Sequence, residues 1–150
     1  MHLSLFEDST SLIAMTEVRT ISRVCLRVRN LGASVAFYRD VLNLEAEQVS
    51  TESLRSQRLI PIGAGDHAPF TIQLSEGRPL PGSFGMDHFT LVASSADRID
   101  EIYDRAVARD ARATQPRTVD DRRQVFLFDP DGHKIEVTAP LMGNGSARHQ

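Results

Sequence analysis

The chain has 150 residues, of which 41% are hydrophobic and 25% are charged, and its formal net charge is −3. This composition is typical of one compact globular domain or of two small modules that share a core. Charges of both signs are dispersed and no apolar run approaches the roughly 18 residues of a membrane span, so we expect neither nucleic acid nor a membrane as a partner.

The N-terminal region, residues 1–20, shows no clear hydrophobic period and is predicted to be an arm, either flexible or a short helix that packs on a partner chain. It carries acidic residues where a signal peptide would be apolar. The only cysteine is Cys25, which excludes an intrachain disulfide. These features together favour a cytoplasmic location.

Residues 21–74 are predicted to form a first module that contains a strand, a helix and about three further strands. Apolar and polar residues alternate over residues 24–28, which indicates a half-buried strand. Asn30 is a candidate N-cap for the helix that follows, because its side chain can accept a hydrogen bond from a free backbone N–H. Asn43 tolerates the left-handed conformation that ends many helices, so the helix is expected to end there.

The pattern then repeats. Residues 75–86, rich in Pro, Gly and Ser, are predicted to be a linker, and residues 87–139 a second module. Its helix is expected to start at Ser94, which begins an S-x-x-D capping pattern. Residues 115–121 are predicted to be a polar loop, and residues 140–150 a flexible tail.

The second module ends in a hairpin over residues 126–137. An Asp-Pro-Asp-Gly turn at residues 129–132 separates an aromatic-rich strand from a short exit strand. In the exit strand Ile135 and Val137 share one face, so Glu136 points to the other. A single glutamate of this kind is usually a solvated carboxylate, so its interpretation depends on the other strands.

The two modules are related by an internal repeat. When the two halves of the sequence are aligned, Arg23 corresponds to His88. With a slightly different offset, Gln73 corresponds to Glu136. Each module therefore carries a polar side chain opposite the apolar face of its first strand and another on its last strand. If the modules pair with pseudo-two-fold symmetry, these four side chains converge on the concave face of a curved sheet.

Four stretches carry a resemblance to a known family, namely Val28-Arg29-Asn30-Leu31, Val41-Leu42-Asn43-Leu44, Met86-Asp87-His88-Phe89 and the segment from Asp129 to Glu136. The chain resembles the vicinal oxygen chelate superfamily, which includes glyoxalase I, bleomycin-resistance proteins, fosfomycin-resistance enzymes and extradiol dioxygenases. The resemblance covers about residues 21–139. It implies an α+β fold in which two paired βαβββ modules form an open cup-shaped sheet, usually in a homodimer.

The resemblance also implies a site. His88 and Glu136 match typical metal ligands of the family and are the expected catalytic residues, and Gln73 is a weaker candidate ligand. Arg23 stands where the metal enzymes have a donor such as His or Gln. A guanidinium has no lone pair for a cation, so Arg23 is expected to bind substrate instead of metal. Gln73 is expected to bind substrate as well.

Two functions stay open. The first, which we favour slightly, is a metal-dependent lyase, isomerase or dioxygenase that acts on a small oxygenated molecule through Zn, Fe, Mn or Ni. The second is a metal-free, antibiotic-type binding or resistance protein in which Arg23 replaces the charge of the metal and pairs with Glu136 or with an anionic ligand. A small molecule and a second copy of the chain are the expected partners.

Overall fold

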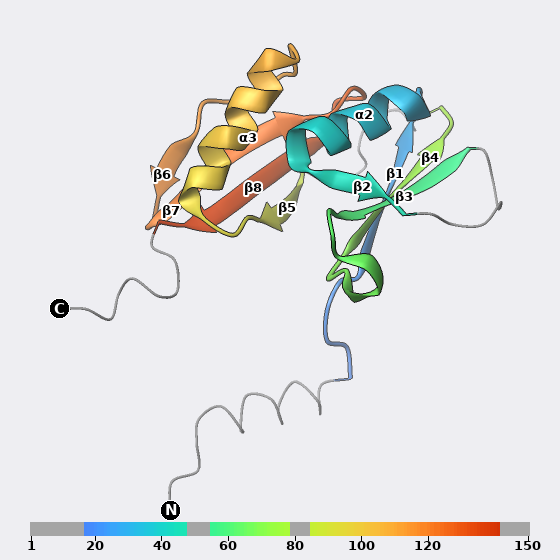
Figure 1. Ribbon diagram of the computed structural model, residues 1–150, viewed down its shortest axis with the longest axis horizontal. Helices are drawn as coiled ribbons and strands as arrows, with labels where there is room; N and C mark the ends of the chain where they lie inside the picture. The colour runs from blue at the N-terminus through green and yellow to red at the C-terminus, as the bar shows by residue number, and fades with distance from the viewer. Residues whose placement is uncertain (1–16, 48–54, 79–84, 142–150) are drawn as a thin grey trace, which may run out of the picture.

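The computed structural model describes residues 17–47, 55–78 and 85–141 (Figure 1). Residues 142–150 of the predicted tail and residues 1–16 of the predicted arm lie outside these residues, as does half of the predicted linker, residues 79–84. The elements are β1 (Arg23–Val28), α2 (Leu31–Leu42), β2 (Leu44–Ala46), β3 (Ser56–Pro61), the short 3₁₀ turn η1 (Gly65–His67), β4 (Thr71–Glu76), β5 (Phe89–Val92), α3 (Ala96–Ala108), β6 (Arg117–Val119), β7 (Arg122–Phe128) and β8 (Lys134–Pro140).

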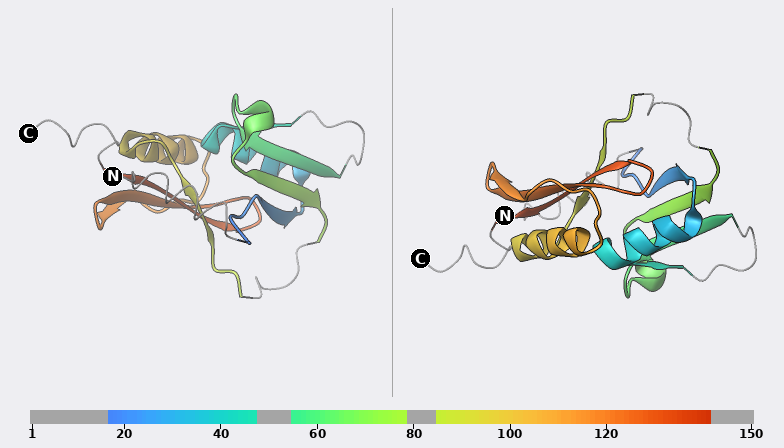
Figure 2. Two further views of the ribbon diagram at one scale, coloured as in Figure 1. Left: turned by 90° about the horizontal axis from the view of Figure 1, so that it is seen from below. Right: turned by 90° about the horizontal axis from the view of Figure 1, so that it is seen from above.

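The strands form two four-stranded sheets, in the orders β1-β4-β3-β2 and β5-β8-β7-β6. In each sheet the first and last strands in sequence are parallel neighbours, and the other pairs are antiparallel. This arrangement confirms the predicted α+β fold and its repeated βαβββ order, and the described strands form no closed barrel. Figure 2 shows α2 and α3 end to end on one side of the molecule. Neither of these helices is long and apolar enough to span a membrane.

Local sequence signals explain most helix ends. The side chain of Asn30 accepts a hydrogen bond from the backbone N–H of Ala33 at 3.0 Å, and Asn43 ends α2 with a φ of 54°. Both cap predictions are confirmed. The second helix begins one residue later than predicted, because Ser95, rather than Ser94, is its extended N-cap. The preceding residues are still tied to the sheet through the backbone of Ala93.

Boundaries of three strands also differ from the sequence-based prediction, and β8 ends at Pro140, the first residue of the predicted tail. β4 continues to Glu76, inside the predicted linker, because Glu76 pairs with Val28 of β1. β6 forms within the predicted polar loop at residues 115–121. It pairs with β7 through a tight turn at Asp120–Asp121, where φ is 50° and 59°. Two successive positive φ values suit the twist of a two-residue hairpin, and aspartate tolerates this conformation better than most residues.

The Asp-Pro-Asp-Gly turn joins the two modules through a buried carboxylate. Asp129 is 5% exposed, and the Tyr38 hydroxyl of α2 donates a 2.8 Å hydrogen bond to its Oδ2. Its Oδ1 accepts from the backbone N–H groups of Asp131 and His133, each at 2.9 Å. Tyr38 is therefore a core residue whose hydroxyl also fastens the second module to the first.

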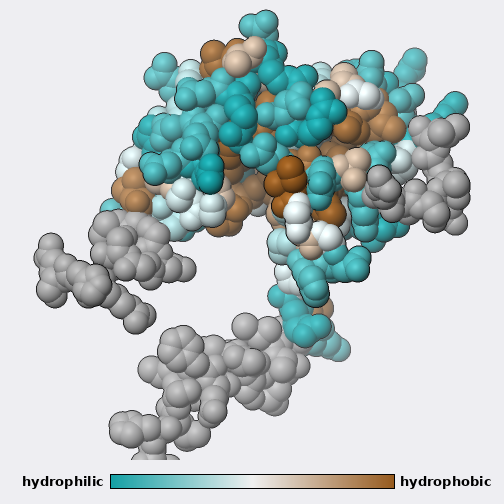
Figure 3. Space-filling model, viewed as in Figure 1, coloured by the Kyte–Doolittle hydropathy of each residue, from teal (hydrophilic) through white to brown (hydrophobic). Residues whose placement is uncertain are grey.

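Other polar contacts extend this junction along the end of β1. The Arg29 backbone N–H donates to Asp131 Oδ1 at 3.1 Å, and His133 Nε2 lies 3.0 Å from the Arg27 carbonyl oxygen. Between the helices, the Arg105 guanidinium donates twice to the Val41 carbonyl oxygen, at 2.9 and 3.1 Å. These contacts hold the C-terminal end of β1 and the helix side of the molecule. Among the described residues, neither helix covers the opposite faces of the two sheets, where a site can lie. The surface over α3 is mainly hydrophilic (Figure 3).

Candidate functional site

The second sheet brings two of the four predicted side chains together. His88 precedes β5, and Glu136 lies in the middle of β8, the parallel neighbour of β5. His88 Nε2 is 3.1 Å from Glu136 Oε2, and their side chains are 29% and 18% exposed. Thr90, directly opposite Glu136 in the register, donates a 3.0 Å hydrogen bond to the same carboxylate oxygen. This His88–Glu136 pair is half-buried yet open to solvent.

The imidazole of His88 is held on its other sides as well. Its Nδ1 is 2.7 Å from Asp87 Oδ2, and its ring packs edge-on against Phe126 with a centroid distance of 5.6 Å. The Lys134 ammonium lies 3.6 Å from Asp87 Oδ2 and 4.6 Å from the centre of the Phe126 ring. The hydrogen bond to His88, together with the positive charge of Lys134, holds the pKa of Asp87 below its usual range.

Glu136 has a partner for its second oxygen too. With its amide oriented by the hydrogen-bond network, Gln124 of β7 donates to Glu136 Oε1 at 3.3 Å and accepts from Arg117 Nε at 3.0 Å. The carboxylate is therefore fixed from both neighbouring strands. Such support is typical of side chains whose position matters for binding.

The first sheet brings the other two predicted side chains together. Arg23 Nη1 donates a 3.0 Å hydrogen bond to Gln73 Oε1, across the parallel strands β1 and β4. Gln73 Nε2 in turn donates to Ser56 Oγ of β3 at 3.2 Å. Arg23 and Cys25 are exposed on the same face of β1, opposite the buried Leu26. The Arg23–Gln73 pair thus lies on the face of the sheet that the helix does not cover.

The two pairs do not meet. In residues 17–47, 55–78 and 85–141, no hydrogen bond or ion pair joins Arg23 or Gln73 to His88 or Glu136. The suggested ion pair between Arg23 and Glu136 is therefore not formed in the single chain. The reason is that the junction holds the far end of β1, at Arg27, whereas Arg23 begins the strand.

The spacing within the His88–Glu136 pair suits two ligands of one cation. A Zn–N or Zn–O bond of about 2.1 Å and a ligand–metal–ligand angle between about 90° and 110° separate two donors by roughly 3.0–3.4 Å. The observed 3.1 Å falls within this range. No group of three or more His, Cys, Asp or Glu side chains that could hold a metal occurs among the described residues. The pair therefore supplies two ligands, and a catalytic site needs at least one more.

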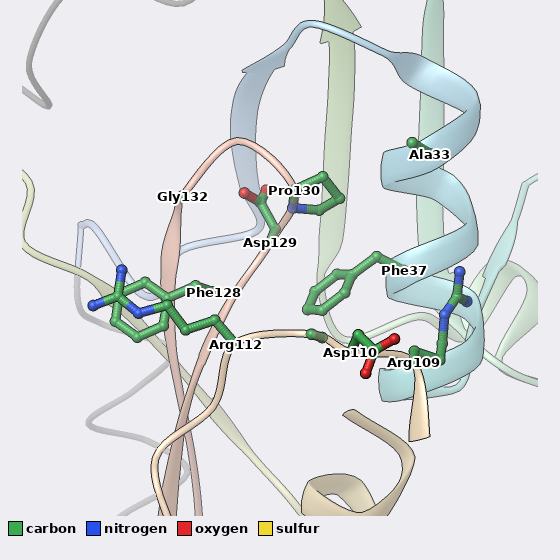
Figure 4. Close-up of a pocket in the computed structure, with 10 residues that line it drawn as sticks. Ala33, Phe37, Arg109, Asp110, Arg112, Phe128, Asp129, Pro130 and Gly132 are labelled. Atoms are coloured by element: carbon green, nitrogen blue, oxygen red, sulfur yellow. The ribbon is translucent and has the colours of Figure 1, made fainter. Parts of the chain in front are cut away.

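A cavity of about 480 Å³ lies on the helix side of the junction and is separate from both pairs. Its lining includes Ala33 and Phe37 of α2, Asp110 after α3, and Asp129 and Pro130 of the turn (Figure 4). None of the four predicted site residues lines it. Its buried carboxylate, Asp129, already accepts a hydrogen bond from the Tyr38 hydroxyl, so this group serves the junction.

Sequence reasoning missed the residues that support the site, such as Thr90 and Gln124, and the roles of Asp87 and Asp129. Asp87 was noted only as part of a family motif, although an acid next to a candidate histidine ligand is a recognisable signal. Asp129 was assigned to a turn without further role. Its bond to the N–H two residues later is an Asx-turn, which a turn motif can predict, whereas its contact with Tyr38 requires the tertiary structure.

Comparisons with known proteins agree with this architecture. The family model described as "Glyoxalase/Bleomycin resistance protein/Dioxygenase superfamily" matches residues 20–137. The metallothiol transferase FosB of Staphylococcus epidermidis is 26% identical over 125 residues, which cover 81% of this chain and 82% of FosB.

Solved structures share the fold. A glyoxylase/bleomycin resistance protein/dioxygenase domain from Frankia superimposes with a TM-score of 0.66 at 20% identity, covering 83% of this chain and 99% of that one. A variant of the fosfomycin resistance protein FosX from Listeria monocytogenes, complexed with Mn(II) and 1S,2S-dihydroxypropylphosphonic acid, gives 0.65 at 22% identity, covering 82% and 93%.

Proposed function

Because the chain belongs to the Glyoxalase/Bleomycin resistance protein/Dioxygenase superfamily, we propose that it uses the His88–Glu136 pair to bind a divalent metal and to modify a small oxygenated molecule. The observation that carries this proposal is the 3.1 Å spacing of His88 Nε2 and Glu136 Oε2 on the uncovered face of the second sheet. The donor types also fit, since imidazole and carboxylate together suit Zn, Fe and Mn.

The residues around the pair have definite tasks in this proposal. A bound divalent metal supplies Lewis-acid polarisation of a substrate oxygen. His88 and Glu136 hold the metal, and Thr90 and Gln124 keep the carboxylate from rotating. Lys134, with its ammonium beside the Phe126 ring and the Asp87 carboxylate, adds a positive charge next to His88.

The relatives support a metal and a small substrate. FosB is called a metallothiol transferase, and the FosX structure contains Mn(II) and a small phosphonic acid with two hydroxyl groups. Group transfer at a metal is therefore a further candidate reaction class, besides lyase, isomerase and dioxygenase chemistry. The identity of the natural substrate is a matter for direct screening.

Titration of the protein with Mn²⁺ tests the proposal. After dialysis against a chelator, we expect calorimetry to show one Mn²⁺ bound for each chain, and elemental analysis of the reloaded protein to give the same ratio. A chain that takes up no metal under these conditions would overturn the metal-dependent function.

A homodimer is part of the same proposal. The described part of a single chain offers two candidate metal ligands, His88 and Glu136. β1 and β5 each lie at one edge of their sheet, where a second chain can approach. A second copy that placed its Arg23–Gln73 pair opposite His88 and Glu136 would add Gln73 as an oxygen donor and Arg23 as a substrate-binding cation. We expect sedimentation equilibrium to give the mass of two chains at micromolar concentration, and a monomer would contradict this arrangement.

The metal-free alternative rests on a different observation, the exposed Arg23 guanidinium fixed by Gln73 at 3.0 Å. If Arg23 replaces the metal charge, the protein should bind 1S,2S-dihydroxypropylphosphonic acid equally well with and without a chelator. Arg23→Ala should then weaken binding by about 10–100-fold, the effect of losing a hydrogen bond between charged groups. Exposed Arg98 on α3 offers the control Arg98→Ala. Binding that needs metal and survives Arg23→Ala would exclude this alternative.

A further inference from the structure

We propose that Asp87 is a positioning residue that fixes the His88 ring with its proton on Nδ1, so that Nε2 is presented to a cation beside Glu136. The inference rests on the proposed metal-dependent function and assigns one more residue to its site. It starts from the short contact of 2.7 Å between Asp87 Oδ2 and His88 Nδ1. An ionised carboxylate can only accept, so Nδ1 carries the hydrogen in this contact. The contact of Nε2 with Glu136 is longer, at 3.1 Å, and is the one that a bound cation would replace.

The contact depends on an irregular stretch of backbone. In a regular strand, neighbouring side chains point to opposite faces, and Asp87 could not reach the ring of His88. Residues 86–88 lie between the turn at Gly85, where φ is 92°, and the start of β5. The chain is therefore not in a regular strand at Asp87, and its carboxylate can fold back onto the adjacent imidazole.

Asp87 is in turn held by β8, the strand that carries Glu136. The Lys134 ammonium is 3.6 Å from Asp87 Oδ2, and Lys134 lies two residues before Glu136 on the same face of the strand. The strand β8 therefore positions both the carboxylate of Asp87, through Lys134, and the candidate ligand Glu136. This placement limits how far the ring of His88 can move relative to Glu136.

Of the other contacts of the ring, Glu136 meets Nε2, the nitrogen that a cation would take, and Phe126 selects neither nitrogen. Phe126 packs edge-on against the imidazole at 5.6 Å, and an apolar contact of this kind accepts either orientation of the ring. Turning the ring over would place the ring carbons Cδ2 and Cε1 where Nδ1 and Nε2 now meet Asp87 and Glu136. Asp87 is the partner that distinguishes the two orientations without occupying the metal-binding nitrogen.

Metal affinity provides the first test. Relative to the wild type, Asp87→Asn and Asp87→Ala should weaken Mn²⁺ binding measured by calorimetry, by about 10–100-fold, the usual effect of losing the partner of a histidine ligand. Asp87→Asn should lose less than Asp87→Ala because the amide oxygen can still accept from Nδ1. Asp104→Asn, an equal charge change at an exposed position of α3, should bind as the wild type does. Equal affinity of all four proteins would overturn the inference.

The ring nitrogens provide a second readout that a merely structural role would not change. In metal-free protein at alkaline pH, ¹⁵N NMR should show the proton of the neutral His88 ring on Nδ1, with the signals assigned by their loss in His88→Gln. Asp87→Ala should move the proton toward Nε2. A wild-type ring with its proton on Nε2 would overturn the role of Asp87, whereas a wild type that binds no Mn²⁺ would instead overturn the proposed function.

Discussion

Replacing Asp129 with alanine is expected to lower the free energy of unfolding by about 2–5 kcal/mol, because buried groups are left without partners. The Tyr38 hydroxyl and the backbone N–H groups of Asp131 and His133 all donate to this carboxylate, which is only 5% exposed. The change would also loosen the turn that joins the two modules. Urea unfolding followed by circular dichroism measures the loss.

Asp129→Asn is the matched control. Its amide oxygen can still accept from the two backbone N–H groups, and its NH₂ group can donate to the Tyr38 oxygen in place of the present bond. Burial raises the pKa of Asp129, so a neutral side chain is also easier to desolvate at this place. We therefore expect Asp129→Asn to lose less than half as much stability as Asp129→Ala. A loss below about 1 kcal/mol in Asp129→Ala, the typical effect of an average substitution, would contradict the role of the junction.

The elements of the fold could be predicted because their signals are local. The alternation in β1, the Asn30 and Asn43 caps and the Asp-Pro-Asp-Gly turn each act within a few residues. β6 could not be predicted in this way. Its three residues are all exposed, so they carry no hydrophobic alternation, and its pairing depends on the positive φ values at Asp120–Asp121.

The candidate site could be predicted within each module but not between modules. The repeat aligns Arg23 with His88 and Gln73 with Glu136, and the two polar side chains of each module lie together in the sheet of that module. The angle between the sheets is set by contacts such as Tyr38 with Asp129, which are far apart in sequence and leave no periodic signal. The sequence therefore indicates which strands carry the polar groups, whereas the placement of one pair relative to the other depends on the junction.

Replacing Glu136 is expected to have the largest effect on metal binding. Glu136→Ala removes a charged ligand, so its loss of Mn²⁺ affinity should exceed the roughly 10–100-fold that changes in supporting residues cost. Glu136→Gln keeps the shape and one oxygen donor but loses the charge, and should lie between Glu136→Ala and the wild type. Thr90→Val removes only the hydroxyl that donates to Glu136 Oε2 at 3.0 Å, so we expect a loss of about tenfold, at the lower end of that range.

A loss of affinity must be separated from a loss of fold. Glu136 bonds to His88 and Thr90, so Glu136→Ala also changes the metal-free protein, and its thermal unfolding should be compared with that of the wild type in a chelator. Glu101→Ala is the control, since Glu101 is an exposed acid of α3 that pairs only with Arg98 among the described residues. If Glu136→Ala stays folded and binds Mn²⁺ as Glu101→Ala does, Glu136 is not a ligand. The 3.1 Å contact with His88 would then be an ion pair of the sheet, and the substrate-binding role of Arg23 would become the better basis for function.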